Sequence, residues 1–239
     1  MRVLVEPERL AAGELAVRGD EHHYLGRVRR ARVGDPVELF DGAGRRAAAR
    51  IVRMTDTETV LQVAEPTLVT PTLPHVTVLL PLLKGDRMDY ALEKLVETGV
   101  DRVVVWPASR SVVKLEPDRR DARAAKYRAA LQAAARQSGR AGMPTLEIAA
   151  DLAAALALLA GDTTRLVLDP ASDTPLAPTV LAGAGAVAIA SGPEGGITPL
   201  ELDRLLAAAF APIGLGPRIL RAETAPVIAM ALVRALTHS

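Results

Sequence analysis

The sequence predicts an α/β protein in which a small β-rich domain precedes a larger domain built on a parallel sheet. Residues 1–70 contain short alternating or β-branched segments between turn signals, and a proline-rich stretch follows them. Beyond that stretch, strand-like and helix-like segments alternate, which is typical of a parallel sheet covered by helices.

The amino-terminal segments predict a small β-barrel. Gly19, Gly34 and Gly42 each stand in a turn signal, and these turns divide the region into pieces of strand length. Strands are expected at residues 16–18, 37–40, 47–54 and 59–63.

Pro66, Pro71 and Pro74, with threonines between them, predict a linker, because proline does not continue a helix or a central strand. The predicted domains are therefore residues 1–71 and 72–239. In the second domain we expect strands at residues 75–82, 102–106, 145–148, 165–169, 186–190 and 212–215, and helices at residues 88–98, 118–138, 152–160, 199–210 and 224–237.

The composition is that of a globular protein, with 49% hydrophobic and 24% charged residues in a chain of 239. There is no cysteine, and His22 and His23 lack the spaced partners of a metal site, so neither disulfides nor a metal are expected. No apolar run reaches the roughly 18 residues needed to span a membrane, and none near the start is typical of a signal peptide. We therefore expect a cytoplasmic protein without a membrane segment.

The net charge is only +1, but the charges are segregated along the chain. Residues 102–140 contain ten Lys and Arg against three Asp and Glu, whereas residues 151–217 contain seven acids against two bases. A second basic cluster comprises Arg27, Arg29, Arg30 and Arg32, which strand alternation would place partly on one sheet face. Both clusters indicate either nucleic-acid binding or an ordinary solvated surface.

The most informative segment runs from Ala190 to Glu201, where an apolar strand leads into a loop with three glycines. Thr198 and Glu201 then form a predicted capping box at the start of a helix. Such loops lie at the carboxyl ends of parallel strands, where open α/β sheets bind ligands. By itself, a tight structural loop is as good an interpretation as a ligand cradle.

Two further loops also follow predicted strands. Residues 214–226 contain Arg218, Arg221 and Glu223 in otherwise apolar surroundings, which indicates either functional charges or a structural ion pair from Arg218 to Glu223. Residues 168–172 form the other loop, and the three loops are predicted to converge on one pocket.

Other motifs are excluded. The residue pattern at 183–188 matches a dinucleotide-binding fingerprint. That fingerprint must follow a strand and lead into a helix, whereas this segment leads into the strand expected at residues 186–190, so we interpret it as a turn. The sequence contains neither a Walker-type phosphate loop nor the G-x-S-x-G elbow of a hydrolase.

Several motifs, taken in order, resemble those of the SPOUT superfamily of methyltransferases, and specifically the RsmE-type 16S rRNA uracil-N3 methyltransferases. The resemblance covers nearly the whole chain, and the motifs are weak singly but highly specific in this order. Val3-Leu4-Val5 depart from the pattern, because the family usually has aromatic residues there. The matching motifs are Arg32-Val33-Gly34-Asp35 leading to Asp41-Gly42, Lys84-Gly85-Asp86-Arg87-Met88-Asp89, Glu93-Lys94 to Glu97-Thr98-Gly99, Arg110-Ser111, Gln137-Ser138-Gly139-Arg140, the glycine loop at residues 192–196, and Leu215-Gly216-Pro217-Arg218-Ile219-Leu220-Arg221-Ala222-Glu223-Thr224-Ala225.

The resemblance implies a PUA-like RNA-binding barrel followed by a methyltransferase domain whose carboxyl-terminal segment threads a trefoil knot. It implies S-adenosylmethionine as the cofactor, 16S rRNA within the 30S subunit as the substrate, and a homodimer. The predicted last helix suits either a subunit interface or a core, because it is strongly apolar at Val227, Ile228, Met230, Leu232, Val233 and Leu236.

The resemblance implies the residues that hold the cofactor, and the chemistry of uracil methylation suggests candidates for the catalytic roles. Arg218 or Arg221 would stabilise negative charge on the uracil oxygens, and Glu194 or Glu223 would accept the imide proton. The cofactor would be held largely by backbone groups of residues Leu168, Gly192, Pro193, Glu194, Gly195, Gly196, Ile197, Leu215, Gly216, Ile219, Leu220 and Thr224. The RNA would contact Arg27, Arg29, Arg30, Lys84, Arg110, Arg136, Gln137 and Arg140.

Two alternatives stay open: another SPOUT activity such as ribose 2′-O-methylation, and a non-catalytic RNA-binding assembly protein on the same scaffold. The predicted barrel and residues 84–89 favour the uracil-N3 family, and the intact glycine loop argues against a non-catalytic protein. A nicotinamide-dependent dehydrogenase is a more distant alternative.

Overall fold

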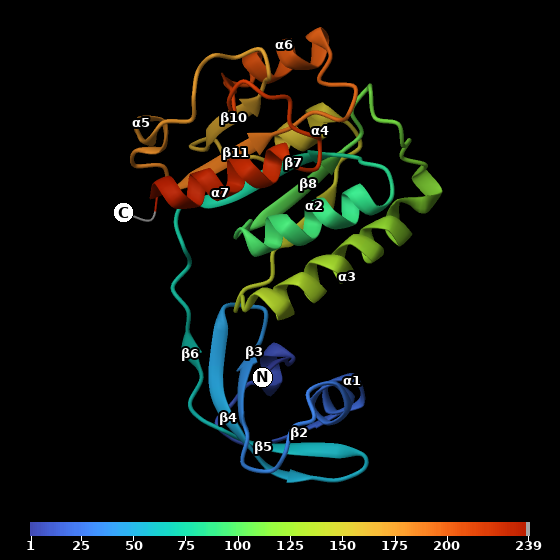
Figure 1. The fold of residues 1–239 in the computed structure, drawn as a ribbon, viewed down its shortest axis with the longest axis vertical. Coiled ribbons are helices and arrows are strands. Elements are labelled where there is room, and N and C mark those ends of the chain that lie inside the picture. Colours follow the sequence, from blue (N-terminus) through green and yellow to red (C-terminus); the bar gives the residue numbers. More distant parts are fainter. Residues whose placement is uncertain (238–239) are drawn as a thin grey trace. The chain divides into compact units, whose positions relative to one another are not determined.

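The computed structural model describes residues 1–237, which form two compact units. One unit comprises Met1–Pro71 with Ala135–Met143, and the other comprises Thr72–Ala134 with the described residues from Pro144 onward. Each unit contains its own six-stranded sheet (Figure 1). Within the described chain, no helix has both the length and the apolar character needed to cross a membrane.

The first unit is a curled, mixed half-barrel, which confirms the predicted PUA-like β domain. The strands follow the order β1-β3-β4-β5-β2, and β6 pairs with β4. Only β1 and β3 pair in parallel; the other pairings are antiparallel. The strands are β1 (Arg2–Leu4), β2 (Gly13–Arg18), β3 (Pro36–Phe40), β4 (Arg45–Met54), β5 (Glu58–Val63) and β6 (Thr67–Leu68).

Alternating side chains of these strands fill the core of the first unit, as the period of two in a strand requires. Val3 and Val5 are buried there, so aliphatic residues do the packing at the positions where the family usually has aromatic ones. Asp41 shapes the turn between β3 and β4, because its buried carboxylate accepts hydrogen bonds from the amides of Ala43 and Arg45 and from Arg45 Nε.

One expectation for this unit is wrong. The arginine cluster does not alternate on a strand, because a helical turn α1 (Gly19–His23) and the π-helical turn η2 (Tyr24–Val28) occupy that segment. Fully buried Leu25 anchors this turn to the core. Within the proline-rich stretch, β6 forms as a two-residue edge strand, which is compatible with a linker because proline is excluded only from helices and central strands.

The second unit has an all-parallel sheet in the order β12-β10-β11-β7-β8-β9, which confirms the predicted parallel α/β domain. Its strands are β7 (His75–Pro81), β8 (Arg102–Trp106), β9 (Thr145–Ile148), β10 (Thr164–Leu168), β11 (Ala186–Ala190) and β12 (Ala211–Ile213). Its helices are α2 (Asp86–Glu97), α3 (Arg120–Ser138), whose last turn belongs to the first unit, α4 (Leu152–Ala157), α5 (Pro178–Leu181), α6 (Pro199–Ala207) and α7 (Ala225–Thr237). Short 3-10 turns are η1 (Pro7–Arg9) in the first unit and η3 (Pro117–Arg119) in the second.

Helices cover both faces of this sheet, as its continuous apolar strands require (Figure 1). Leu79, Trp106 and Ala190 pack with Leu152 of α4 and Leu205 of α6 on one face. On the other face, α7 contacts α2, β7 and β11. The single turn α5 was not predicted, because four residues are too few to show helical periodicity.

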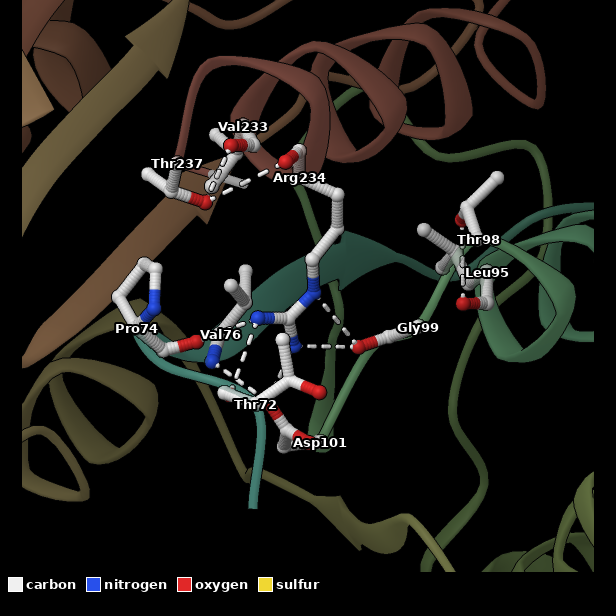
Figure 2. A network of polar contacts seen from close by, with 10 residues as sticks. All are labelled: Thr72, Pro74, Val76, Leu95, Thr98, Gly99, Asp101, Val233, Arg234 and Thr237. Atoms are coloured by element: carbon white, nitrogen blue, oxygen red, sulfur yellow. Dashed lines mark hydrogen bonds and ion pairs between the residues drawn. The ribbon is translucent and has the colours of Figure 1, made fainter. Parts of the chain in front are cut away.

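A buried arginine on α7 ties the end of the chain to the beginning of this unit (Figure 2). Arg234 Nη1 donates to the carbonyl of Pro74 at 2.7 Å, and its Nη2 donates to the carbonyl of Gly99 at 2.6 Å and to Asp101 Oδ2 at 2.7 Å. This network fixes α7, and with it the loop that enters α7. The trefoil knot implied by the family resemblance stays a prediction.

Candidate active site

Three loops that follow neighbouring parallel strands enclose a cavity of about 510 Å³. β12, β10 and β11 are adjacent in the sheet, and they lead into residues 214–224, 169–177 and 191–198 respectively. Loops at the carboxyl ends of parallel strands are the usual place for a ligand in such a sheet.

The structure brings most of the predicted cofactor residues to this cavity. Gly195, Gly216 and Thr224 are not among its lining residues in the described part of the chain. The predicted residues that line it are Leu168, Gly192, Pro193, Glu194, Gly196, Ile197, Leu215, Arg218, Ile219, Leu220, Arg221 and Glu223. Lining residues that the sequence did not assign individually to the site are Arg87, Asp169, Pro170, Ser191, Leu202, Ile213, Ala222 and Ala225, five of which belong to the three predicted loops.

The glycine loop is closely packed upon itself. A Cβ on Gly192 would lie 2.8 Å from Ile197 Cγ1, so a larger residue would push the two ends of the loop apart. Gly196 has a φ of +74° and donates its amide to the carbonyl of Pro193 at 2.8 Å. That conformation favours glycine. The loop then enters α6 through the predicted capping box of Thr198 and Glu201, which the structure confirms.

The loop after β10 packs against the start of the loop after β12. The amide of Gly214 donates to the carbonyl of Thr174 at 2.8 Å, and the amide of Asp169 donates to the carbonyl of Ile213 at 3.0 Å. The carbonyl oxygen of Ser172 lies 2.1 Å from where a Cβ on Gly214 would stand. Glycine at position 214 therefore permits the contact that joins two walls of the cavity.

The loop before α7 presents charged side chains with contrasting environments. Arg218 and Arg221 are exposed, whereas the Glu223 side chain is only 10% exposed. Glu223 pairs with Arg221, whose Nη1 lies 3.8 Å from Glu223 Oε1, and not with Arg218, which was the partner in the structural alternative. Glu223 Oε2 is buried and has no hydrogen-bond partner among the described residues.

An ion pair crosses the cavity wall between two distant parts of the sequence. Arg87 Nη1, in the first turn of α2, lies 2.9 Å from Glu194 Oε1 in the glycine loop. Sequence reasoning placed Arg87 in a family motif but did not assign it to the site. Its position follows from the pairing of β7 with β11, which brings the residues after β7 beside the glycine loop.

Glu201 links the glycine loop to the loop that follows β8. Its Oε1 accepts the amide of Ser109 at 2.7 Å, and its Oε2 accepts the amide and the hydroxyl of Thr198 at 2.9 and 2.8 Å. Burial raises the pKa of Glu201, but these hydrogen bonds outweigh burial and hold the pKa below its ordinary value. The neighbouring Arg110 Nη1 donates to the carbonyl of Gly195 at 3.0 Å.

The predicted RNA-binding residues are divided between the two units. Arg27, Arg29 and Arg30 are exposed in the first unit, and Arg30 adopts an unusual positive φ of 52°. The same unit contains Gln137, Arg140 and Arg136, and Arg136 lies 3.7 Å from Glu21. Lys84 and Arg110 belong to the second unit.

Family models match both units. The model of an RNA methyltransferase domain matches residues 71–234, and the model of an RNA methyltransferase PUA domain matches residues 17–63. The first match alone spans well over half of the chain.

Relatives with known names agree with these models. The chain is 34% identical over 236 residues to the ribosomal RNA small subunit methyltransferase E of Mycobacterium bovis, with 92% of this chain and 86% of the relative covered. It is 27% identical to the protein of the same name from Bacillus subtilis, with 93% and 90% covered.

The structure is also similar to a solved structure with the same name. The ribosomal RNA small subunit methyltransferase E of Neisseria gonorrhoeae, bound to S-adenosyl methionine, superposes with a TM-score of 0.87 at 29% identity. The superposition covers 98% of this chain and 97% of the other. The chain therefore belongs to the RsmE family, the ribosomal RNA small subunit methyltransferases E, which are SPOUT-type RNA methyltransferases with a PUA domain.

Proposed function

We propose that this protein transfers a methyl group from S-adenosylmethionine to the N3 atom of a specific uridine in 16S rRNA. The observation that carries the proposal is the cavity formed by the loops after β10, β11 and β12 in a chain of this family. The Neisseria gonorrhoeae relative and a Legionella pneumophila methyltransferase of the same fold, with 26% identity and a TM-score of 0.85, both have S-adenosylmethionine bound in their solved structures.

The residues around the cavity fit this cofactor. A volume of about 510 Å³ lies in the range typical of small-molecule sites. Apolar side chains such as Leu168, Ile197 and Leu220 supply walls for an adenine ring. Ser191 Oγ and Glu223 Oε2, both from residues that line the cavity, are buried polar atoms without a partner in the described chain, so ligand groups have protein atoms left to bind. When bound, the cofactor supplies an electrophilic methyl group on a sulfonium.

The chain itself must orient the uracil and manage its charge. Loss of the imide proton spreads negative charge onto the uracil oxygens, and an exposed arginine beside the cavity, Arg218 or Arg221, stabilises that charge. Of the two candidate proton acceptors, we favour Glu223. The Glu194 carboxylate already accepts a hydrogen bond from Arg87, whereas one carboxylate oxygen of Glu223 has no partner among the described residues.

We further propose residues 1–71 as the RNA-binding domain and residues 72–239 as the catalytic domain. Exposed Arg27, Arg29 and Arg30 in the first unit are suited to phosphate contacts, which position an RNA without reading its sequence. A uridine within folded 16S rRNA has to leave its stack to reach the cavity. The 30S subunit is the proposed partner and the cytoplasm the proposed location.

The protein is proposed to act as a homodimer. Ile228 and Leu232 are 40% and 37% exposed and stand four residues apart on α7, whereas Met230 and Val233 are buried. The last helix therefore packs one apolar face into the core and keeps apolar side chains on its surface. Light scattering at several protein concentrations tests the dimer, and a mass of one chain throughout contradicts it.

Nucleoside mass spectrometry of 16S rRNA from a strain that lacks this gene tests the proposed reaction. We expect 3-methyluridine to disappear and to return when the gene is restored. Loss of a 2′-O-methylated nucleoside instead identifies the alternative SPOUT activity, and unchanged nucleosides support the non-catalytic alternative.

A further inference from the structure

The cavity wall contains a pair of opposite charges in direct contact. Arg87 and Glu194 lie 2.9 Å apart, and their side chains are 47% and 21% exposed. Most of the other lining residues are apolar or glycine. A pair exposed to this extent contributes at most about 1 kcal/mol to stability, so both charged groups stay available to a ligand in the cavity.

We propose that Arg87 and Glu194 together bind the amino-acid end of the methyl donor. Arg87 receives the α-carboxylate and Glu194 receives the α-ammonium group. The inference rests on the proposed function, because it assumes that S-adenosylmethionine occupies this cavity. A zwitterion lying antiparallel to the ion pair gives every charge an opposite partner, so neither the ligand nor the protein buries an uncompensated charge.

The other charges around the cavity are less suited to a zwitterion. Asp169 already accepts the amide of Ala171 at 2.9 Å. Arg221 and Glu223 are separated by 3.8 Å, and the Arg221 side chain is 78% exposed, which suits a group that meets RNA. Among the described lining residues, Arg87 and Glu194 form the ion pair with hydrogen-bond geometry.

The pair also joins the two elements that a bound donor would have to hold together. Arg87 belongs to the first turn of α2, and Glu194 lies between Pro193 and Gly195 in the glycine loop. A donor whose adenine lies against the apolar wall and whose charged end reaches this pair extends across the cavity. Arg87 and Glu194 are thus both assigned to cofactor binding. For Glu194 this role differs from the proton transfer considered above.

Calorimetry with S-adenosylmethionine and with its decarboxylated form tests the assignment, because the second ligand lacks only the carboxylate. We expect the unmodified protein to bind S-adenosylmethionine about tenfold more tightly than the decarboxylated form. Arg87→Ala should lose about tenfold in affinity for S-adenosylmethionine and should bind the decarboxylated form as the unmodified protein does. Glu194→Gln should weaken both ligands, since both keep the ammonium group.

Arg119→Ala is the matched control, because Arg119 forms a 2.9 Å ion pair with Glu116 on the exposed surface and does not line the cavity. It should bind both ligands like the unmodified protein. Equal weakening of both ligands by Arg87→Ala overturns the inference, because it indicates a role in ordering the loop only. Unchanged binding of S-adenosylmethionine by Arg87→Ala overturns it as well. Failure of the unmodified protein to bind either ligand contradicts the proposed function itself.

Discussion

Arg234 on the last helix donates to Asp101 at 2.7 Å, and the same Asp101 oxygen accepts the amide of Val76 at 2.8 Å. The contact joins α7 to the starts of β7 and β8, more than a hundred residues earlier in the chain. Because α7 follows directly on the loop with Arg221 and Glu223, this contact also holds one wall of the cavity in position.

Arg234→Ala should lower the free energy of unfolding by about 3–5 kcal/mol, because it leaves the largely buried carboxylate of Asp101 without this partner and removes hydrogen bonds to three carbonyls. Urea denaturation of the purified variant measures the loss. Arg119→Ala removes an exposed ion pair and should change stability by no more than about 1 kcal/mol. Equal stability of the two variants would show that the Arg234 network contributes little.

Glu201→Gln should destabilise the protein by about 1–3 kcal/mol at pH 7, because an amide offers one acceptor oxygen where Ser109 and Thr198 need two. The pKa of Glu201 is lower in the folded protein than its ordinary value. Its charge therefore stabilises the fold fully above about pH 4.3, and that stabilisation is lost as the pH falls through the folded pKa. The difference between variant and parent should shrink in acid. Denaturant titrations at pH 7 and in mild acid test this, and a difference independent of pH contradicts it.

Gly214→Ala should separate two walls of the cavity, since its Cβ would lie 2.1 Å from the carbonyl oxygen of Ser172. We expect a loss of about 1–3 kcal/mol in stability and weaker binding of S-adenosylmethionine by calorimetry. Gly185→Ala is the control, because a Cβ there meets open space and its φ is not in the positive range. Identical cofactor affinity in both variants would show that the contact with Ser172 does not shape the site.

Arg221→Ala should slow single-turnover methylation about a hundredfold, because it removes a charge that stabilises the ionised uracil. Its affinity for S-adenosylmethionine should stay close to that of the parent protein, since Arg221 is one of two candidates for the uracil and is not proposed to hold the cofactor. Arg204→Ala removes an exposed arginine from α6 that does not line the cavity, and should keep the parent rate. An unchanged rate in Arg221→Ala makes Arg218 the remaining candidate.

Local patterns were enough to predict most elements of the second unit. The apolar runs of β7 and β11 and the capping box at Thr198 lie within a few neighbouring residues, so they can be read without knowing the fold. The segment with Arg27 and Arg29 was misread, because its helical turns are set by the burial of Leu25 in the core and not by a local period.

The site itself depends on contacts that no local pattern contains. Arg87 reaches Glu194 only because β7 pairs with β11. The residues of the two strands do not by themselves predict that the strands are neighbours. The capping role of Glu201 was predictable from Thr198 three residues before it, whereas its bond to Ser109 spans 92 positions. The glycine and arginine motifs identified the loops, and the topology decided which side chains meet in them.

Methyl transfer in vitro tests the central claim most directly. The purified protein is incubated with S-adenosylmethionine carrying a deuterated methyl group and with 30S subunits from a strain that lacks this gene. Nucleoside mass spectrometry should then find the deuterated methyl group on N3 of a single uridine in 16S rRNA. Transfer to a ribose hydroxyl, or no transfer by a protein that binds the cofactor, would contradict the account.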